Sequence, residues 1–487
     1  MRSLVFLCLL LGAGWSAYAQ ALAVSEPERV NSTLLNYRVL GKNDGGVLIY
    51  KHRRDKEVIE AYDRNMALVR RKTLGTGGKT AETVNILLTP DGGLIHFYAY
   101  KEKRLEYLEA QRLDANLVDV GEAVLIDSVD NREEGNWDDF MVRQSLDLSL
   151  FIVFRMDART TYLEGVHTRV INAQLQEVYR DLLVLEDSDG QMLLNDAFIS
   201  DQGDLAFAFV RDQGRLRAES FPHVVLHIRP VDFGLFTRLV VDDLPEARVR
   251  EIDFAWDQIN NRLVGTGFYA ENNRNFASGV LFFSAEANGQ WKAKTFAPFS
   301  PDFVEDISGR STRKRDEIPL YDVQNLIVRS DGGAVLVAEY VNESSEAYEY
   351  TDYDPYYGGY RTATRYINYH EYEDILLLMV DPDGTVHWDD VIRKKQVSRE
   401  DFGRNSSFCM LNAQSRLFFI FNEDISYDTN VMQYVLDTKG TLHRDAILNA
   451  DANEIMLVPR KALQVSGNEI VIPSLYKNNL AFVKLAY

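Results

Sequence analysis

The chain has 487 residues, of which 46% are hydrophobic, and it carries a formal net charge of −20 at pH 7. A nucleic-acid-binding protein needs a surplus of Lys and Arg to neutralise phosphates, so this charge argues against nucleic acid and equally against an anionic lipid surface. The length and the hydrophobic content are ample for a large buried core.

The N-terminus has the pattern of a secretory signal. Arg2 precedes an apolar run at 4–15, and Ala17 and Ala19 form a small-residue cleavage site before Gln20. We therefore expect residues 1–19 to be removed and the mature protein to be periplasmic or secreted. A membrane anchor is the alternative, but roughly 12 apolar residues fall short of the about 20 that span a bilayer. No later membrane insertion is expected.

Turn signals recur along the mature chain. Each is a cluster of Asp, Asn and Gly followed by a run rich in Val, Ile, Leu, Phe and Tyr, a pattern typical of a hairpin that leads into a buried strand. Clear copies begin at 43 (NDGGVLIYK), 90, 200, 330 and 466, and weaker copies begin at 146, 257 and 412. A second tight turn, such as VDPDGTVHW at 380–388, follows most of them.

Each repeat therefore predicts four antiparallel strands, here named A to D, over roughly 45 to 55 residues, which is the blade of a β-propeller. Eight repeats favour eight blades. The last repeat ends after its third strand, so its outer strand would come from residues soon after Gln20 or from 34–40; the latter choice would give seven blades. We predict an all-β fold, a β-propeller of four-stranded antiparallel blades, as a single domain over 20–487.

The long insertions should all lie on one face of this propeller. The A–B and C–D turns of a four-stranded blade share one face, and the B–C loops and the D–A links between blades share the other. The segments 127–139, 300–319 and 341–373 fall on this second face, which we call the link face. A loop of this length in a compact domain is usually functional or disordered.

The segment 341–373 contains nine tyrosines, including five in YTDYDPYYGGYR at 350–361. Clustered tyrosines offer rigid rings with a hydroxyl at the tip, which suits a protein or glycan partner. The alternatives are a loop that plugs the central channel and a mobile loop. The predicted binding residues are Tyr350, Tyr353, Tyr356, Tyr357, Tyr360, Arg313, Arg315 and Trp137, with the arginines available for a carboxylate or an acidic sugar.

Linear motifs for catalysis or metal binding are not evident. The sequence has no GxSxG, HExxH or P-loop motif, and His223 and His227 have no third ligand at a convincing spacing. Cys409 lies in an apolar strand, where inert burial is expected. We therefore predict no catalytic residue, metal or cofactor. Carboxylates for glycoside cleavage can still be assembled from different blades, and the candidates on the link face are Asp138, Asp139, Asp352 and Asp354.

The segment 369–408 resembles a stretch found in secreted propeller-like repeat proteins of Bacteroidota, to which no activity is attached. The resemblance is carried by a D-x-x-G turn, a following Trp and an Ile-x-Lys-x-Gln element. The matching residues are Asp381, Gly384, Trp388, Ile392, Lys394 or Lys395, and Gln396. It covers about 40 residues and implies an exported propeller, without an activity or a site.

The sequence thus predicts an exported, non-catalytic binding or scaffold protein that recognises a protein or glycan through the link face. The alternative is a carbohydrate-active enzyme, a hydrolase or lyase, that uses carboxylates on the same face. A purely structural role is the third possibility, and the oligomeric state is left open.

Overall fold

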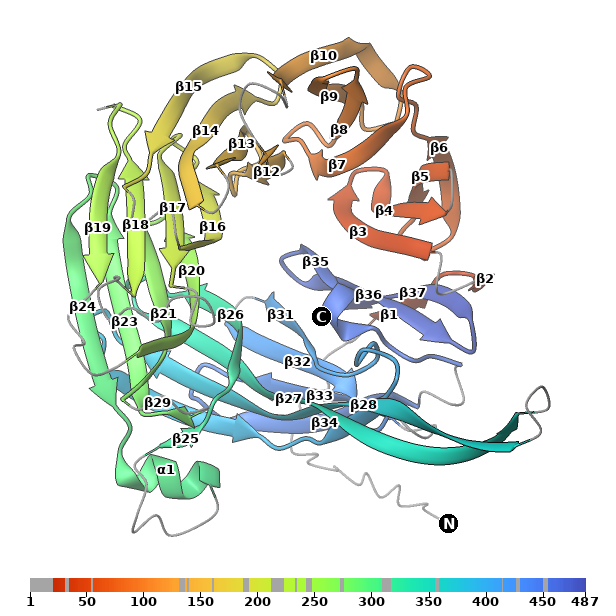
Figure 1. The fold of residues 1–487 in the computed structure, drawn as a ribbon, viewed down its shortest axis with the longest axis vertical. Helices are drawn as coiled ribbons and strands as arrows, with labels where there is room; N and C mark the ends of the chain where they lie inside the picture. Colours follow the sequence, from red (N-terminus) through yellow and green to blue (C-terminus); the bar gives the residue numbers. More distant parts are fainter. Residues whose placement is uncertain are drawn as a thin grey trace, which may run out of the picture.

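The computed structural model describes residues 21–30, 35–53, 56–130, 136–137, 140–159, 162–186, 192–211, 223–232, 234–241, 248–271, 276–308, 317–354, 359–413, 415–425, 430–449 and 454–487. These residues are almost entirely β-structure. They form eight antiparallel sheets of four or five strands and one two-stranded ribbon. Figure 1 shows the sheets following one another around a ring in chain order. The predicted fold class, a β-propeller of four-stranded antiparallel blades, is confirmed, while the number of blades stays a prediction.

The first four sheets each run from an inner to an outer strand in chain order. The first contains β3 (Leu35–Asn43), β4 (Gly46–Arg53), β5 (Lys56–Tyr62) and β6 (Leu68–Thr73); the second β7 (Ala81–Leu88), β8 (Leu94–Glu102), β9 (Leu105–Leu113) and β10 (Asp119–Asp130). The third contains β11 (Asn136–Trp137), β12 (Met141–Gln144), β13 (Leu150–Arg159), β14 (Tyr162–Asn172) and β15 (Glu177–Val184); the fourth β16 (Leu193–Ile199), β17 (Leu205–Val210), β18 (Val224–Arg229) and β19 (Thr237–Val241).

The fifth to seventh sheets continue the ring. The fifth contains β20 (Arg248–Asp257), β21 (Arg262–Ala270), β23 (Gly279–Glu286) and β24 (Trp291–Pro298); the sixth β26 (Asp322–Val328), β27 (Ala334–Asp354), β28 (Gly359–Val380), β29 (Val386–Ile392) and β30 (Gln396–Arg399); the seventh β31 (Cys409–Ala413), β32 (Arg416–Asn422), β33 (Asn430–Leu436) and β34 (Leu442–Asn449). The ribbon pairs β22 (Phe276–Ala277) with β25 (Ile318–Pro319).

The last sheet joins the two ends of the chain. It contains β35 (Leu463–Ser466), β36 (Glu469–Tyr476) and β37 (Asn479–Ala486), preceded by the 3₁₀ helix η2 (Pro459–Lys461). Its outer strand is β1 (Ala21–Val24), which pairs with β37 from Ala21↔Ala486 to Val24↔Val483, and β2 (Glu28–Arg29) extends the same edge. The first of the two predicted donors, the residues after Gln20, therefore supplies this strand, whereas the described part of 34–40 belongs to β3.

The predicted tight turns lie between the strands as expected. At the first of them Gly46 has φ +121°, and a Cβ atom there would lie 1.8 Å from the carbonyl oxygen of Tyr62, so the turn requires glycine. Between the sheets, apolar side chains interdigitate in separate buried clusters. Burial of each large side chain contributes roughly 1.5–3 kcal/mol.

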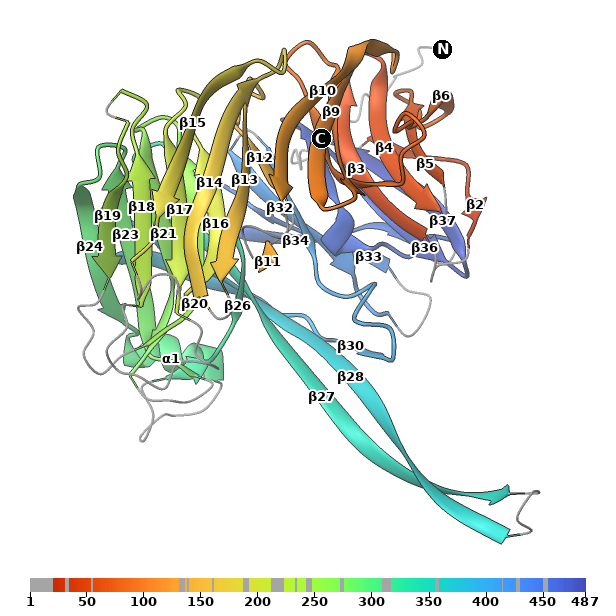
Figure 2. The same cartoon turned by 45° about the horizontal axis from the view of Figure 1, so that its top comes forward.

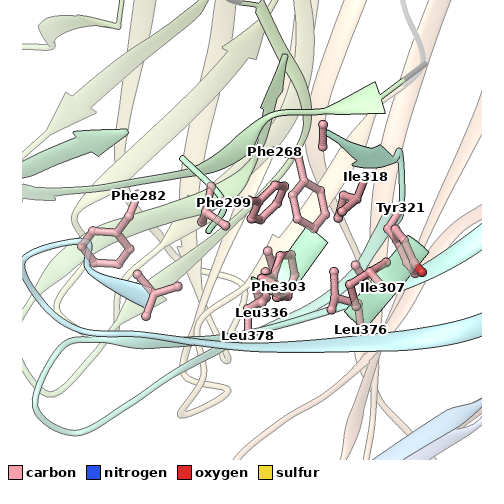
Figure 3. Close-up of a cluster of buried hydrophobic side chains, with 14 of the residues drawn as sticks. Phe268, Phe282, Phe299, Phe303, Ile307, Ile318, Tyr321, Leu336, Leu376 and Leu378 are labelled. Carbon is pink, nitrogen blue, oxygen red and sulfur yellow. The ribbon is translucent and has the colours of Figure 1, made fainter. Parts of the chain in front are cut away.

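The segment 300–319 is not simply a loop. Residues Pro301–Ser308 form α1, which Figure 1 shows outside the ring beside β25. Figure 3 shows Phe303 and Ile307 of this helix among the rings and aliphatic chains of the cluster that joins the fifth and sixth sheets. The rings of Phe299 and Phe303 lie 4.7 Å apart. This part of the insertion therefore belongs to the core.

The segment 341–373 also differs from the expected loop. It continues β27 and β28 as one long hairpin, paired without interruption from Val341↔Tyr372 to Asp354↔Gly359. Figure 2 shows this hairpin extending away from the ring. The physical reason is that tyrosine and threonine recur throughout the segment, and such side chains favour the extended backbone of a strand over an irregular loop.

Candidate functional site

The predicted binding residues are not gathered in one place. Tyr350 and Tyr353 belong to β27 and Tyr360 to β28, with Tyr353 paired to Tyr360 near the tip of the hairpin. Trp137 belongs to β11 of the third sheet, which Figure 2 shows well away from that tip. The other predicted residues, Tyr356, Tyr357, Arg313 and Arg315, lie outside the described residues, as do Asp138 and Asp139.

A hollow of about 1020 Å³ lies where the first, second and last sheets meet. It is at the link face, because its walls are the ends of the inner strands together with the D–A links that precede them. The lining residues from the first sheet are Asn36, Tyr37, Arg38, Val39, Tyr50, His52 and Glu57. The link to the second sheet contributes Leu74, Thr76 and 79–84, and the approach to the last sheet contributes 460–463.

Successive side chains along a strand point to opposite faces of its sheet, so the lining residues of the first sheet lie on two different faces. Asn36 pairs with His52 across β3 and β4, and His52 pairs with Glu57 across β4 and β5. Arg38 and Tyr50 form the next cross-strand pair on the same face. This face is directed at the second sheet, since Arg38 donates a hydrogen bond to the carbonyl oxygen of Ile86 in β7 at 3.3 Å. Tyr37 points to the opposite side, where its ring lies 6.1 Å from Phe482.

A chain of hydrogen bonds fixes the carboxylate of Glu57. The Tyr50 hydroxyl donates to Oε1 at 2.9 Å, and the Thr83 hydroxyl donates to Oε2 at 2.6 Å. The Thr83 oxygen in turn lies 2.8 Å from Nε2 of the buried His96. His52 completes the group, with Nδ1 3.9 Å from Glu57 Oε1. Tyr50 and His52 of the first sheet and Thr83 of the second thus surround one carboxylate, and His96 lies behind Thr83.

Burial sets the protonation of two members of this group. Burial lowers the pKa of His96 from 6.5 to about 4, a shift that the charge of Glu57 opposes, so His96 is neutral near pH 7. Because Thr83 donates to Glu57, the neutral imidazole supplies the N–H in its contact with Thr83. Burial, and then the negative charge of Glu57, raises the pKa of Tyr50, so its hydroxyl keeps its proton.

Four cations surround the hollow and its rim: Arg38, Arg404, Arg460 and Lys461. Among the described residues none of the four has a carboxylate oxygen within 4.0 Å. Arg460 donates to the carbonyl oxygens of Phe402 and Gly403 at 2.6 and 3.0 Å, and the Lys461 amine lies 4.4 Å from the centre of the Tyr37 ring. Partial burial, and then the charge of Arg404, lowers the pKa of Lys461.

This cationic surface belongs to a protein with a formal charge of −20, in which many Lys and Arg side chains contact a carboxylate, as Lys79 does with Glu109 at 2.7 Å. Four cations that have no carboxylate partner in the described part of the chain produce a local positive potential around this concavity, which attracts anions. The hollow is therefore suited to an anionic ligand.

Sequence reasoning did not find this site. Arg38, Tyr50, His52 and Glu57 form no motif, because their proximity depends on strand pairing and on contact between two sheets. One usable signal was the Arg460–Lys461 pair, which precedes the last repeat on a link and has no acid beside it in sequence. The prediction concentrated instead on the longer and more aromatic insertion.

The structure also places the other residues considered in the sequence analysis. In the described part of the chain, no three His, Cys, Asp or Glu side chains gather in a way that could hold a metal ion. His223 and His227 are buried in the fourth sheet, and burial raises the pKa of the Cys409 thiol. No helix among the described residues is long and apolar enough to cross a membrane.

Comparison with known proteins found no matching family model and no matching curated protein. Several solved structures are similar in fold. A prolyl endopeptidase matches 94% of this chain and 55% of its own length, with 11% identity and a TM-score of 0.41. The polysaccharide lyase Uly1 matches 95% of this chain and 99% of its own, with 9% identity and a TM-score of 0.39. A GH43 β-1,3-galactosidase matches 62% of this chain and 92% of its own, with 9% identity and a TM-score of 0.25.

This chain spans about half the length of the prolyl endopeptidase and of a puromycin hydrolase that it also matches, since it covers 55% and 50% of those chains. The prediction of a non-catalytic binding or scaffold protein is contradicted, because the similar structures are those of peptidases, a lyase and a glycosidase. At such identities the likeness concerns the fold, and no residue role is transferred from these proteins.

Proposed function

We propose that this protein is a carbohydrate-active enzyme that binds an acidic polysaccharide in the hollow between the first, second and last sheets. The observation that carries the proposal is the set of four cations that have no carboxylate partner among the described residues and lie around a concavity of about 1020 Å³. Ligand sites typically measure about 300–1,000 Å³, so this hollow has room for more than one sugar unit.

The walls provide what recognition of an acidic sugar requires. Arg38, Arg460 and Lys461 can bind carboxylate or sulfate groups, and the ring of Tyr37 lies beside the Lys461 amine. On the wall next to Arg38, the Tyr50 phenol donates a hydrogen bond to the Glu57 carboxylate at 2.9 Å, and the His52 imidazole lies 3.9 Å from the same carboxylate. Such groups perform proton transfer.

The test is an activity assay on the mature protein with polygalacturonate, alginate and hyaluronan, with dextran as the neutral comparison, in which new reducing ends are measured. Cleavage of at least one acidic polymer and none of dextran is expected. Lys461→Glu should reduce cleavage by about tenfold or more at low salt, since it reverses one charge beside the site. The matched control is Lys439→Glu, an exposed lysine in a C–D turn on the opposite face.

Two results would count against the proposal. Equal effects of the Lys461 and Lys439 substitutions would mean that only the overall charge matters. No reducing ends from any acidic polymer, with a folded protein, would remove the assignment of an enzyme acting on such polymers.

A further inference from the structure

Building on the proposed function, we propose that the turn at 400–407 forms a second subsite for the same acidic polysaccharide at the rim of the hollow. The Phe402 ring stacks on one sugar unit, and Arg404 and Lys461 bind an acidic group of the polymer. The juxtaposition that carries this inference is an exposed aromatic ring on a strained turn beside two cations that have no carboxylate partner among the described residues.

The turn at 400–407 connects the hollow with the base of the long hairpin. It follows β30, which pairs with β28 at that base (Figure 2). On its other side it contacts the wall of the hollow, because the lining residue Arg460 donates hydrogen bonds to the carbonyl oxygens of Phe402 and Gly403 at 2.6 and 3.0 Å. A polymer chain that extends past Arg460 therefore meets this turn.

The backbone of the turn is strained. Glu400, Phe402 and Ser407 have φ values of +57°, +59° and +72°. A positive φ is unfavourable for side chains of this kind, since the Cβ atom crowds the backbone. Strain of this sort persists only where the surrounding structure fixes it, and it is common at ligand-binding positions.

Hydrogen bonds from two other segments hold the turn in this conformation. The Asn405 side-chain amide donates to the carbonyl oxygen of Leu457 at 2.9 Å, and the Ser407 backbone N–H donates to Gln396 Oε1 at 2.8 Å. Together with the two contacts described above, these bonds offset the cost of the positive φ values. The Phe402 side chain is therefore presented from a fixed backbone.

The Phe402 ring does little for the packing of the protein. It is 77% exposed, and its one ring contact among the described residues is a tilted one with His370, at 5.9 Å between ring centres. The apolar faces of the ring are thus largely in water, where they can stack on a ring of a ligand. A strained position that displays an aromatic ring instead of burying it indicates a role in binding.

Arg404 places a positive charge beside the same turn. Burial raises the pKa of Tyr37, a shift that the charge of Arg404 opposes, and burial and then Arg404 lower the pKa of Lys461. Tyr37 and Lys461 both line the hollow, so Arg404 lies at its edge. The two cations repel each other, and an anion bound between them would relieve this repulsion.

The acids of the turn do not neutralise these cations. Glu400 Oε1 accepts a hydrogen bond from the Asn368 backbone N–H at 2.6 Å, and Asp401 Oδ1 accepts one from the Gly403 backbone N–H at 3.0 Å. Both carboxylates are thus used to shape the turn. The acidic group of a polysaccharide can supply the missing negative charge next to a ring that accepts its sugar.

The experiment measures binding, so its result does not depend on cleavage. The mature protein is run in native gels that contain polygalacturonate, alginate or hyaluronan. Each polymer that retards it is then supplied as oligosaccharides of increasing length for isothermal titration at low salt and low temperature. Affinity should rise once with the oligosaccharides that fill the hollow and again with those that also reach the turn.

Two substitutions test the subsite. Phe402→Ala should weaken binding of long oligosaccharides by roughly three- to tenfold and leave the shortest ligands unaffected. Arg404→Gln should weaken binding of the long ones by about tenfold at low salt and by less at high salt. The matched controls are Leu235→Ala, which is also 77% exposed, and Lys439→Gln; both residues lie in C–D turns on the opposite face.

A third variant, Phe402→Gly, separates binding from a structural role. Glycine adopts a positive φ without steric cost, so the midpoint of urea denaturation should not fall, while binding of long oligosaccharides weakens as in Phe402→Ala. A lower midpoint in both Phe402 variants would mean that the ring supports the fold, which would overturn its assignment to the subsite.

The outcomes separate this inference from the proposed function. Long oligosaccharides that bind Phe402→Ala and Arg404→Gln as tightly as the unchanged protein would overturn the second subsite and leave the proposed function intact. Equal weakening of short and long ligands would also overturn it, because the effect would then lie in the hollow. Retardation by none of the three polymers would overturn both proposals.

Discussion

Replacement of Lys394 by methionine should destabilise the protein strongly. The Lys394 amine lies 2.6 Å from Glu339 Oε1, and the two side chains are 2% and 0% exposed. The amine also donates to the carbonyl oxygen of Tyr372 at 3.2 Å and to Gln396 Oε1 at 3.1 Å. Burial raises the pKa of Glu339 and lowers that of Lys394, and each charge opposes the shift of the other.

The expected magnitude follows from the missing partner. Lys394→Met leaves the Glu339 carboxylate buried, with the Ser407 hydroxyl as its one remaining donor among the described residues. Loss of one member of a buried ion pair typically costs about 3–5 kcal/mol. The double variant Glu339→Leu/Lys394→Met removes both charges and should recover most of this loss, because a packed apolar pair needs no compensation. Lys395→Met is the matched control, because that side chain is 69% exposed.

The assay is urea denaturation monitored by tryptophan fluorescence, with the free energy of unfolding compared among the four proteins. A loss of less than about 1 kcal/mol for Lys394→Met, comparable with a surface ion pair, would refute the reasoning. So would a double variant whose loss equals or exceeds that of Lys394→Met alone.

Three other predictions concern different parts of the molecule. Burial lowers the pKa of His96 to about 4 in the folded protein, against 6.5 in the unfolded chain. The free energy of unfolding should therefore be constant in this respect above pH 6.5 and fall by roughly 3 kcal/mol as the pH drops toward 4. His96→Gln should flatten this dependence, which denaturation curves recorded at several pH values would measure. Phe303→Ala should cost about 3–5 kcal/mol by leaving a cavity under α1, measured by the same denaturation, and a loss below about 1 kcal/mol would show that the helix is not packed there. Replacement of 348–365 by a short Gly-Ser turn should change the unfolding free energy by less than about 1 kcal/mol, because a lone two-stranded hairpin contributes little; a larger loss would mean that the hairpin supports the ring.

The architecture was predictable because its signals are local. Asp, Asn and Gly turns with φ above zero, such as that at Gly46, fix where one strand ends and the next begins. The missing fourth strand of the last repeat predicted a donor either just after Gln20 or at 34–40, and the structure shows the first of these. The helix α1 also had local signals that the prediction did not use, since Ser300 accepts a hydrogen bond from the Phe303 backbone N–H and Pro301 opens the helix.

The candidate site was not predictable in the same way. Glu57 is separated from Thr83 and His96 by 26 and 39 positions, and only the stacking of two sheets brings their polar atoms within hydrogen-bonding distance. Tyr50, His52 and Glu57 come from one hairpin between positions 50 and 57, but this segment has no known motif, and Thr83 and His96 belong to another sheet. The tyrosines of 341–373 drew attention by their number, whereas the site depends on a few residues placed by strand register.

The pairing of β1 with β37 has a consequence for how the chain can be cut and rejoined. Ala21 lies directly opposite Ala486 in antiparallel register, so the two ends of the described chain are adjacent. A link of a few residues would turn this pairing into an ordinary hairpin, and new ends could be placed in an exposed turn such as that around Lys439. In the natural order the pairing closes a loop of almost the whole chain and costs roughly 5 kcal/mol of closure entropy. A permuted chain would form the same strands, but β1 and β37 would then be neighbours in sequence and their pairing would close only a short loop. Such a chain should fold faster and keep the hollow unchanged.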